Sequence, residues 1–275
     1  MIAVTVDSNG QLPPELAAAW DVSVIPITIV IDGEELPETE VDADEFYDAL
    51  ARGAEISTSL PAPGEIAAIW DGLAARLDAD EIVSFHVSSD LSGTCNSARL
   101  AAELTSVPVR VVDTGQVSFG ISCALWAARL ALAEGVGPDE ALDRAAGVAK
   151  ALSNVFVMDG LELARRSGRL SGPVPEASGG VDVYSFVEGH LDVVGAATGD
   201  TSAVELMADT VLADRRPIRA AVGHGHASLR PVADALAERL SSAEDVVELV
   251  RYRVGPSVAA FSGPGSAGAY WFPAD

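Results

Sequence analysis

The sequence predicts an α/β protein made of two domains. Short β-rich runs alternate with helical stretches over the first 160 residues, whereas hairpin-like strands mixed with helices follow Gly160. Strands that alternate with helices are typical of a parallel sheet with right-handed crossovers. A chain of 275 residues with 49% hydrophobic side chains is large enough for two domains with buried cores. We therefore expect a first domain over residues 1–158 and a second over residues 159–275.

The first domain is expected to be Rossmann-like, with a parallel sheet. Helical spacing is clearest after Gly64, where apolar residues recur at positions 66, 69, 70, 73 and 77. Asp42 or Asp44 is a candidate cap for an earlier helix. The predicted strands cover residues 2–6, 22–30, 81–87, 107–112 and 154–158, and the predicted helices cover residues 44–52, 64–77, 92–104, 119–133 and 137–152.

The second domain is expected to be α/β with a mixed sheet. Residues 171–180 form a loop by composition, and Glu188-Gly189 is typical of a hairpin turn. The predicted strands cover residues 181–187, 190–194, 218–223, 246–260 and 269–272, and the predicted helices cover residues 161–166, 201–213 and 227–240.

The charge of the chain restricts its partners. Seventeen Lys and Arg stand against 41 Asp and Glu, a formal net charge of −24. Such a charge argues against nucleic acid and against anionic membrane surfaces. The best candidate for a spanning helix, residues 120–135, contains Arg129 and Glu134, so we expect no integral membrane insertion. With no signal peptide visible, we expect a cytoplasmic location, in which Cys95 and Cys123 are reduced thiols in or near the core.

The segment richest in small polar residues, 88–97, lies where a predicted strand ends and a predicted helix begins. Ligands of open α/β sheets bind outside the carboxyl ends of the strands. A helix N-terminus there offers free N–H groups and the positive end of the helix dipole. Ser88, Ser92 and Thr94 add hydroxyl groups, and Gly93 permits close approach to the backbone. The pattern predicts a small site for a carboxylate or phosphate, although plain helix capping explains part of it.

Two further polar patches have weaker signals. Thr58 and Ser59 precede Pro63-Gly64-Glu65, which is typical of a capped turn at the start of a helix. Residues 255–268 contain Gly-Pro and Gly-Pro-Gly sequences, which suit either a loop over a ligand or a turn between strands.

Catalytic and metal-binding motifs are weak. The sequence contains no phosphate-binding loop, nucleophile elbow or dinucleotide-binding fingerprint. His86 and His190 have no obvious nucleophile or acid partner, and His224 with His226 lacks a third metal ligand. We expect no catalytic residue, no metal and no cofactor.

A series of motifs in the expected order makes the chain resemble the DegV family. The most specific is Ser88-Ser89-Asp90-Leu91-Ser92-Gly93-Thr94-Cys95-Asn96-Ser97-Ala98. The resemblance is strong over residues 1–171, weak over 172–250 and moderate over 254–272. The other similar segments are residues 6–13, 24–27, 58–65, 112–114, 118–120 and 163–171, and Gly255-Pro256 with Gly263-Pro264-Gly265.

The resemblance implies a protein that binds one long-chain fatty acid. The acyl chain would be buried in the first domain, and the carboxylate would lie near the domain interface. Members that work with a separate fatty-acid kinase present the carboxylate to that enzyme and have no catalytic residues themselves. Position by position, the resemblance assigns the head group to Thr58 or Ser59 and to Ser92, with Gly93 and Thr94 beside them.

The chain departs from the family pattern in its second half. Phe261 stands where the family commonly has a His that donates to the head group, so one contact is expected to be missing. Residues 172–180 replace a Leu-rich segment, and residues 196–201 lack the usual Lys and Arg. Two other classes stay open: an enzyme for small substrates related by fold to dihydroxyacetone kinases, and a protein-interaction module without a ligand. Turnover of a substrate would favour the first, and an empty or collapsed pocket would favour the second.

Overall fold

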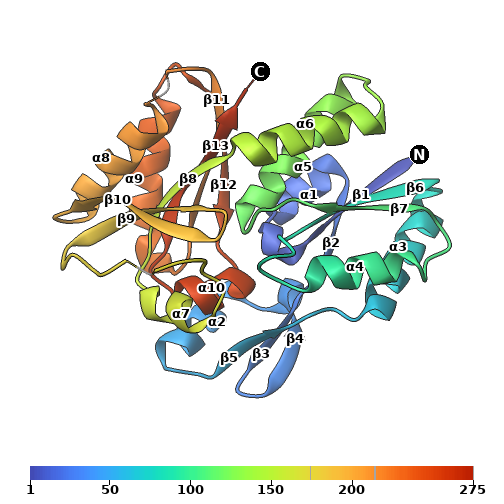
Figure 1. The fold of residues 1–275 in the computed structure, drawn as a ribbon, viewed down its shortest axis with the longest axis horizontal. Helices are drawn as coiled ribbons and strands as arrows, with labels where there is room; N and C mark the ends of the chain where they lie inside the picture. Colours follow the sequence, from blue (N-terminus) through green and yellow to red (C-terminus); the bar gives the residue numbers. More distant parts are fainter. Residues whose placement is uncertain (174, 214, 275) are drawn as a thin grey trace. The chain divides into compact units, whose positions relative to one another are not determined.

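The computed structural model describes residues 1–173, 175–213 and 215–274 (Figure 1). The chain divides into two compact units, one comprising residues 1–41 and 55–149 and the other residues 42–54 and 150–275. The second unit thus contains helix α2 (Ala43–Ala51), whose N-cap Asp42 accepts hydrogen bonds from the amides of Asp44 and Glu45. We describe each unit by itself.

The first unit contains the predicted parallel sheet. Its strands are β1 (Ile2–Asp7), β2 (Val22–Ile25), β6 (Glu81–His86) and β7 (Val109–Asp113), in the order β2-β1-β6-β7, and all neighbours are parallel. This confirms the α/β class and the Rossmann-like sheet that the sequence predicts.

Helices cover both faces of this sheet, as Figure 1 shows. Val83 and Phe85 of β6 pack in a cluster with α1 (Pro14–Trp20), α5 (Phe119–Ala133) and α6 (Pro138–Ala151). Ile82, one residue out of phase, packs in a second cluster with α3 (Pro63–Leu77) and α4 (Thr94–Ala102). The alternation of side chains along a strand therefore assigns each position to one helical layer.

A small third sheet was not predicted. The expected strand over residues 22–30 is wrong, because β2 ends at Ile25 and β3 (Thr28–Ile31) belongs to a separate antiparallel sheet. Pro26 has no backbone N–H to donate and separates the two strands. In this sheet β3 lies between β4 (Glu34–Pro37) and β5 (Ile56–Ser59).

The second unit contains the predicted mixed sheet, with the order β10-β9-β8-β13-β11-β12. Its strands are β8 (Ser153–Val157), β9 (Val181–Val187), β10 (His190–Ala197), β11 (Ile218–His224), β12 (Val246–Arg253) and β13 (Ala267–Pro273). β11 pairs with β12 in parallel, whereas the other neighbours are antiparallel. The sequence alone grouped the strand at 154–158 with the first domain, but β8 pairs with β13 and β9 and so belongs to this sheet.

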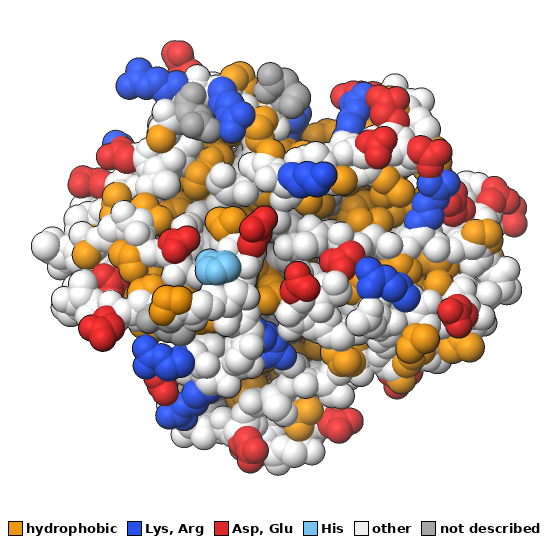
Figure 2. Space-filling view, viewed as in Figure 1, with side chains coloured by type: hydrophobic (Ala, Val, Ile, Leu, Met, Phe, Trp, Pro, Cys, Tyr) orange, Lys and Arg blue, Asp and Glu red, His pale blue; other side chains and the backbone are white. Residues whose placement is uncertain are grey.

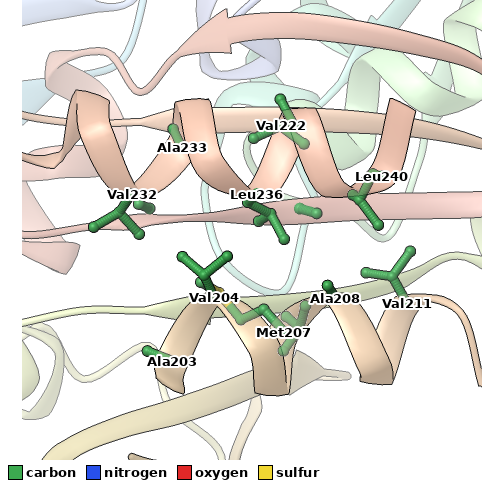
Figure 3. Close-up of a cluster of buried hydrophobic side chains, with 14 of the residues drawn as sticks. Ala203, Val204, Met207, Ala208, Val211, Val222, Val232, Ala233, Leu236 and Leu240 are labelled. Carbon is green, nitrogen blue, oxygen red and sulfur yellow. The ribbon is translucent and has the colours of Figure 1, made fainter. Parts of the chain in front are cut away.

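Helices α8 (Asp200–Val211) and α9 (Arg230–Ser241) form the main core of this unit with the sheet (Figure 3). Val204 and Met207 of α8 and Val232 and Leu236 of α9 are among its buried side chains. The predicted strand over residues 246–260 is partly wrong, because β12 ends at Arg253 and helix α10 (Pro256–Ser262) follows with a proline at its first position. The remaining short helices are η1 (Ser8–Gly10), η2 (Glu38–Glu40), α7 (Leu161–Arg166) and η3 (Ala227–Leu229).

Among the described residues, no helix is both long and apolar enough to cross a membrane. On the face shown in Figure 2, Lys and Arg side chains stand among Asp and Glu side chains.

Candidate functional site

The loop that joins β6 to α4, residues 88–94, is the centre of the candidate site. It lies at the carboxyl end of a parallel strand, as predicted. The amides of Leu91 and Ser92 both donate to the Ser88 carbonyl oxygen at 3.0 Å, and the Ser88 amide donates to the Gln116 carbonyl oxygen at 2.9 Å. These bonds give the loop a defined turn before the helix begins.

Helix α4 begins at Thr94, two residues later than predicted, and Gly93 is its N-cap. The oxygens of Ser92 and Thr94 lie 2.9 Å apart, and the Thr94 amide donates to the Ser92 hydroxyl oxygen at 3.3 Å. Ser92 and Gly93 are half-buried, whereas Thr94 is fully buried. Gly93 offers no side-chain acceptor to the first turn of α4, and the Thr94 amide is bonded by Ser92 instead.

The structure joins the second predicted patch to this loop. The Ser97 hydroxyl of α4 donates to the Pro61 carbonyl oxygen at 2.6 Å. A Cβ atom at Gly93 would lie 2.8 Å from a methyl carbon of Leu60, so the Leu60 side chain lies directly on the glycine. Thr58 and Ser59, at the end of β5, directly precede Leu60 and Pro61, which make these contacts. Thr58 is half-buried and Ser59 is exposed.

The third predicted patch has a structural explanation within the second unit. The Gly160 amide donates to the Ser262 carbonyl oxygen at 3.0 Å, and the Gly265 amide donates to the Asp159 carboxylate at 2.8 Å. The Gly-Pro-Gly segment after α10 is therefore hydrogen-bonded to the connection between β8 and α7.

Phe261 lies on α10 of the second unit, and its ring faces a cation. The guanidinium carbon of Arg169 lies 3.7 Å from the centre of the Phe261 ring, a cation–π contact. Burial lowers the pKa of Arg169 from its ordinary value. The sequence motif that contains Arg169 and the position of the unexpected Phe261 are thus brought together, which the sequence did not predict.

The expectation that His86 has no obvious nucleophile or acid partner is wrong. Its Nε2 atom lies 2.7 Å from the Ser84 hydroxyl oxygen, and its Nδ1 atom lies 3.3 Å from the Asp7 carboxylate. Ser84 and His86 share one face of β6, and Asp7 comes from the neighbouring strand β1. The alternation of side chains along a strand could have placed Ser84 and His86 on one face. It could not have placed Asp7 beside them, because that depends on the register of two strands 79 residues apart.

The turn after β1 contains further buried polar contacts that the sequence did not single out. Ser8 accepts a hydrogen bond from the Ile27 amide at 2.9 Å and donates to Glu38. The side-chain oxygen of Asn9 accepts from the Ser118 amide at 3.0 Å. These contacts explain the segment Asp7-Ser8-Asn9 as a structural junction of the first unit.

Two titratable groups near the loop respond to its environment. Although burial acts against ionisation of Asp113, hydrogen bonds from Ser89 and Gly115 and the charge of Arg99 hold the pKa of this carboxyl below its ordinary value. Burial, followed by the charge of Asp113, raises the pKa of the Cys95 thiol to about 11. Cys95 and Cys123 are both free and buried, as predicted.

Fold and loop together define an α/β protein of two units in which a polar loop joins strand β6 of a parallel sheet to helix α4. The chain belongs to the DegV family: the family model, described as an uncharacterised protein of the DegV family, matches residues 1–274. A DegV domain-containing protein of Streptomyces coelicolor is 33% identical over 276 residues, covering 97% of this chain and 96% of the relative. One from Mycobacterium tuberculosis is 31% identical over 274 residues, covering 97% and 95%.

Solved structures of the family share the fold. A DegV family protein from Thermus thermophilus, described by its fatty-acid binding, has a TM-score of 0.88 at 28% identity and covers 99% of both chains. DegV of Bacillus subtilis, described as a fatty acid binding protein, has a TM-score of 0.85 at 23% identity with 98% of both chains covered. The second of these likenesses supports the fold alone.

Proposed function

We propose that this chain is a cytoplasmic, non-catalytic carrier of one long-chain fatty acid, with the carboxylate bound at the 88–94 loop. The observation that carries the proposal is the contact between the two polar patches. Ser97 donates to the Pro61 carbonyl oxygen, and the Leu60 side chain lies on Gly93 at the start of α4. The Thermus thermophilus protein, which is described by fatty-acid binding, supports the choice of ligand.

The head group would be recognised by hydroxyls and amides rather than by a cation. Ser92 and Thr94 present their hydroxyl groups at the start of α4, and Thr58 and Ser59 present theirs at the end of β5. Each charge-assisted hydrogen bond contributes about 1.5–3 kcal/mol. Phe261 cannot donate a hydrogen bond, so it supplies no polar contact of the kind that the family's histidine would.

The acyl chain would supply most of the affinity. Both faces of the first unit's sheet carry apolar clusters, with Phe85 and Ile121 in one and Ile66 and Trp70 in the other. Burying about 14 methylenes at about 0.8 kcal/mol each gives on the order of 11 kcal/mol before the costs of association. The tail would therefore determine most of the affinity, and the head group would determine how far into the protein the acyl chain lies.

We extend the proposal to a separate fatty-acid kinase as the partner that receives the carboxylate. Residues 196–201, which join β10 to α8, contain no Lys or Arg. A kinase that engages this chain would consequently bind it without basic side chains in that segment. Phosphorylation of bound fatty acid by a purified kinase, measured with and without this chain, tests the extension.

Native mass spectrometry of freshly purified protein, followed by lipid extraction, tests the main proposal. We expect one acyl chain with a free carboxylate per protein chain. Ser92→Ala should weaken fatty-acid binding by about 1–3 kcal/mol, because a desolvated carboxylate loses one donor. Ser106→Ala is the matched control, since the Ser106 hydroxyl bonds Asp71 rather than the loop.

Binding titrations and thermal unfolding are measured for both variants. A Ser92→Ala protein that binds as tightly as the unaltered chain would assign Ser92 to the local turn with Thr94 alone. Protein that carries no lipid and also fails to bind added fatty acid would overturn the proposal as a whole.

A further inference from the structure

A chain of buried polar side chains crosses the face of the first unit's sheet that packs against α3 and α4. The Trp70 indole donates to the Thr5 hydroxyl at 3.2 Å, and Thr5 donates to Ser84 at 2.7 Å. Ser84 lies 2.7 Å from Nε2 of His86, whose Nδ1 lies 3.3 Å from Asp7. These five residues are at most 1% exposed. Buried polar groups in an apolar layer are costly unless they are paired. We therefore ask what this row of polar side chains contributes to the protein.

The hydrogen bonds can be followed as far as His86. The Trp70 indole donates to Thr5, and Thr5 donates to Ser84. The direction of the bond between Ser84 and Nε2 of His86 depends on the imidazole tautomer. Nδ1 of His86 lies 3.3 Å from the Asp7 carboxylate but has no hydrogen-bond partner among the described residues, so the row of hydrogen bonds ends at His86.

Asp7 is hydrogen-bonded to the residue that directly precedes the candidate site. Its Oδ2 atom accepts a hydrogen bond from the Val87 amide at 2.8 Å. The next residue, Ser88, provides the carbonyl oxygen that accepts from both Leu91 and Ser92.

We propose that Asp7 is a positioning residue that holds the 88–94 loop in the conformation that receives the ligand carboxylate. The inference rests on the proposed function for the identity of the ligand, but the effect on the loop is independent of it. Asp7 does not touch the head group and acts through the Val87 amide.

The order Ser84–His86–Asp7 resembles the hydrogen-bond order of a serine hydrolase. The resemblance does not extend to reactivity. Ser84 is fully buried, and its oxygen already accepts from Thr5, so an acyl group has no access to it. Labelling of Ser84 by a fluorophosphonate reagent would contradict this interpretation and overturn the positioning role.

The test compares Asp7→Ala, which removes the acceptor for Val87, with Asp7→Asn, which retains an amide oxygen able to accept the same bond. In Asp7→Ala we expect faster amide hydrogen exchange at Val87 and Ser88, and fatty-acid binding weakened about tenfold, equal to about 1.4 kcal/mol. Asp7→Asn should restore slow exchange at Val87 and most of the affinity. Ser122→Ala is the matched control, because it loses one buried hydrogen bond, to Gly10 at 2.6 Å, in the same unit.

Measurements on the unaltered protein keep the proposal falsifiable if Asp7→Ala does not fold. Its Val87 amide should exchange as slowly as the amides within β6. Rapid exchange at Val87 would overturn the inference. Equal exchange and affinity in Asp7→Ala and Ser122→Ala would also overturn it. Unaltered protein that binds no fatty acid would refute the proposed function, while exchange at Val87 would still decide the role of Asp7.

Discussion

At the scale of single residues, the contacts that shape the candidate site come from side chains to which the sequence assigned no individual role. Ser97 joins two polar patches through one hydrogen bond to Pro61, and Asp7 anchors Val87 from a different strand. Phe261 replaces an expected histidine, yet its ring packs against Arg169. A residue's role here depends on a partner far away in the chain.

His224 allows a prediction about pH. It ends β11, and its two ring nitrogens are buried without a hydrogen-bond partner among the described residues. Burial, together with the charges of Arg253 and Arg230, lowers the pKa of its imidazole. The unfolded chain therefore takes up a proton more readily than the folded chain. Stability from this group is complete above about pH 6.5, the ordinary value for histidine, and is lost as the pH falls below it.

We therefore expect His224→Gln to lose less stability than the unaltered protein between pH 7.5 and pH 5.5, measured by thermal unfolding. His190→Gln is the control, because His190 is an exposed residue of the β9–β10 hairpin. If the unfolding midpoint of His224→Gln falls with decreasing pH as steeply as that of the unaltered protein, the acid sensitivity arises from other groups.

At the scale of elements, the sequence predicted best where one local pattern determines the structure. Helix α3 was expected over residues 64–77 and spans Pro63–Leu77, because its apolar spacing and its Pro-Gly-Glu start agree. Strand β8 was grouped with the wrong sheet, because its neighbours β13 and β9 follow much later in the chain. The Ser88–Ser97 segment was recognised as a site candidate, whereas Asp7, Ser84 and His86 were not, because their contacts depend on strand register.

Two glycines should respond in opposite ways to the same substitution. A Cβ atom at Gly160 would lie 2.3 Å from the backbone of Ser262, at the junction between β8–α7 and the end of α10. A Cβ atom at Gly147, within α6, has no neighbour within 4 Å. Gly160→Ala should thus lower the free energy of unfolding by about 1–3 kcal/mol, the usual cost of overpacking. Gly147→Ala should raise it by about 0.5–1 kcal/mol, since alanine favours the helix.

Chemical denaturation of both variants checks this pair. Equal losses would mean that Gly147 has a constraint beyond helix propensity, and an unchanged Gly160→Ala protein would mean that the backbone at Ser262 can move aside.

At the scale of the whole molecule, a formal net charge of −24 sets the response to salt. Salt weakens the exposed ion pairs, such as those of Arg144 with Glu134 and Glu140, but pairs of this kind contribute only about 0–1 kcal/mol each. Salt also screens the mutual repulsion of the excess acidic side chains, which acts against the compact state throughout the surface. With so large an excess of one sign, the second effect should exceed the first.

We therefore expect the midpoint of thermal unfolding to rise when NaCl is increased from about 0.01 M to about 1 M, a change that shortens the Debye length from about 30 Å to about 3 Å. Replacing the exposed residues Glu34 and Glu35 by Gln should reduce this rise, because it lowers the net negative charge without touching a buried side chain. A midpoint that falls with salt in the unaltered protein would mean that the individual ion pairs outweigh the general repulsion. In that case the charge would matter for stability through specific pairs such as Arg251 with Asp234.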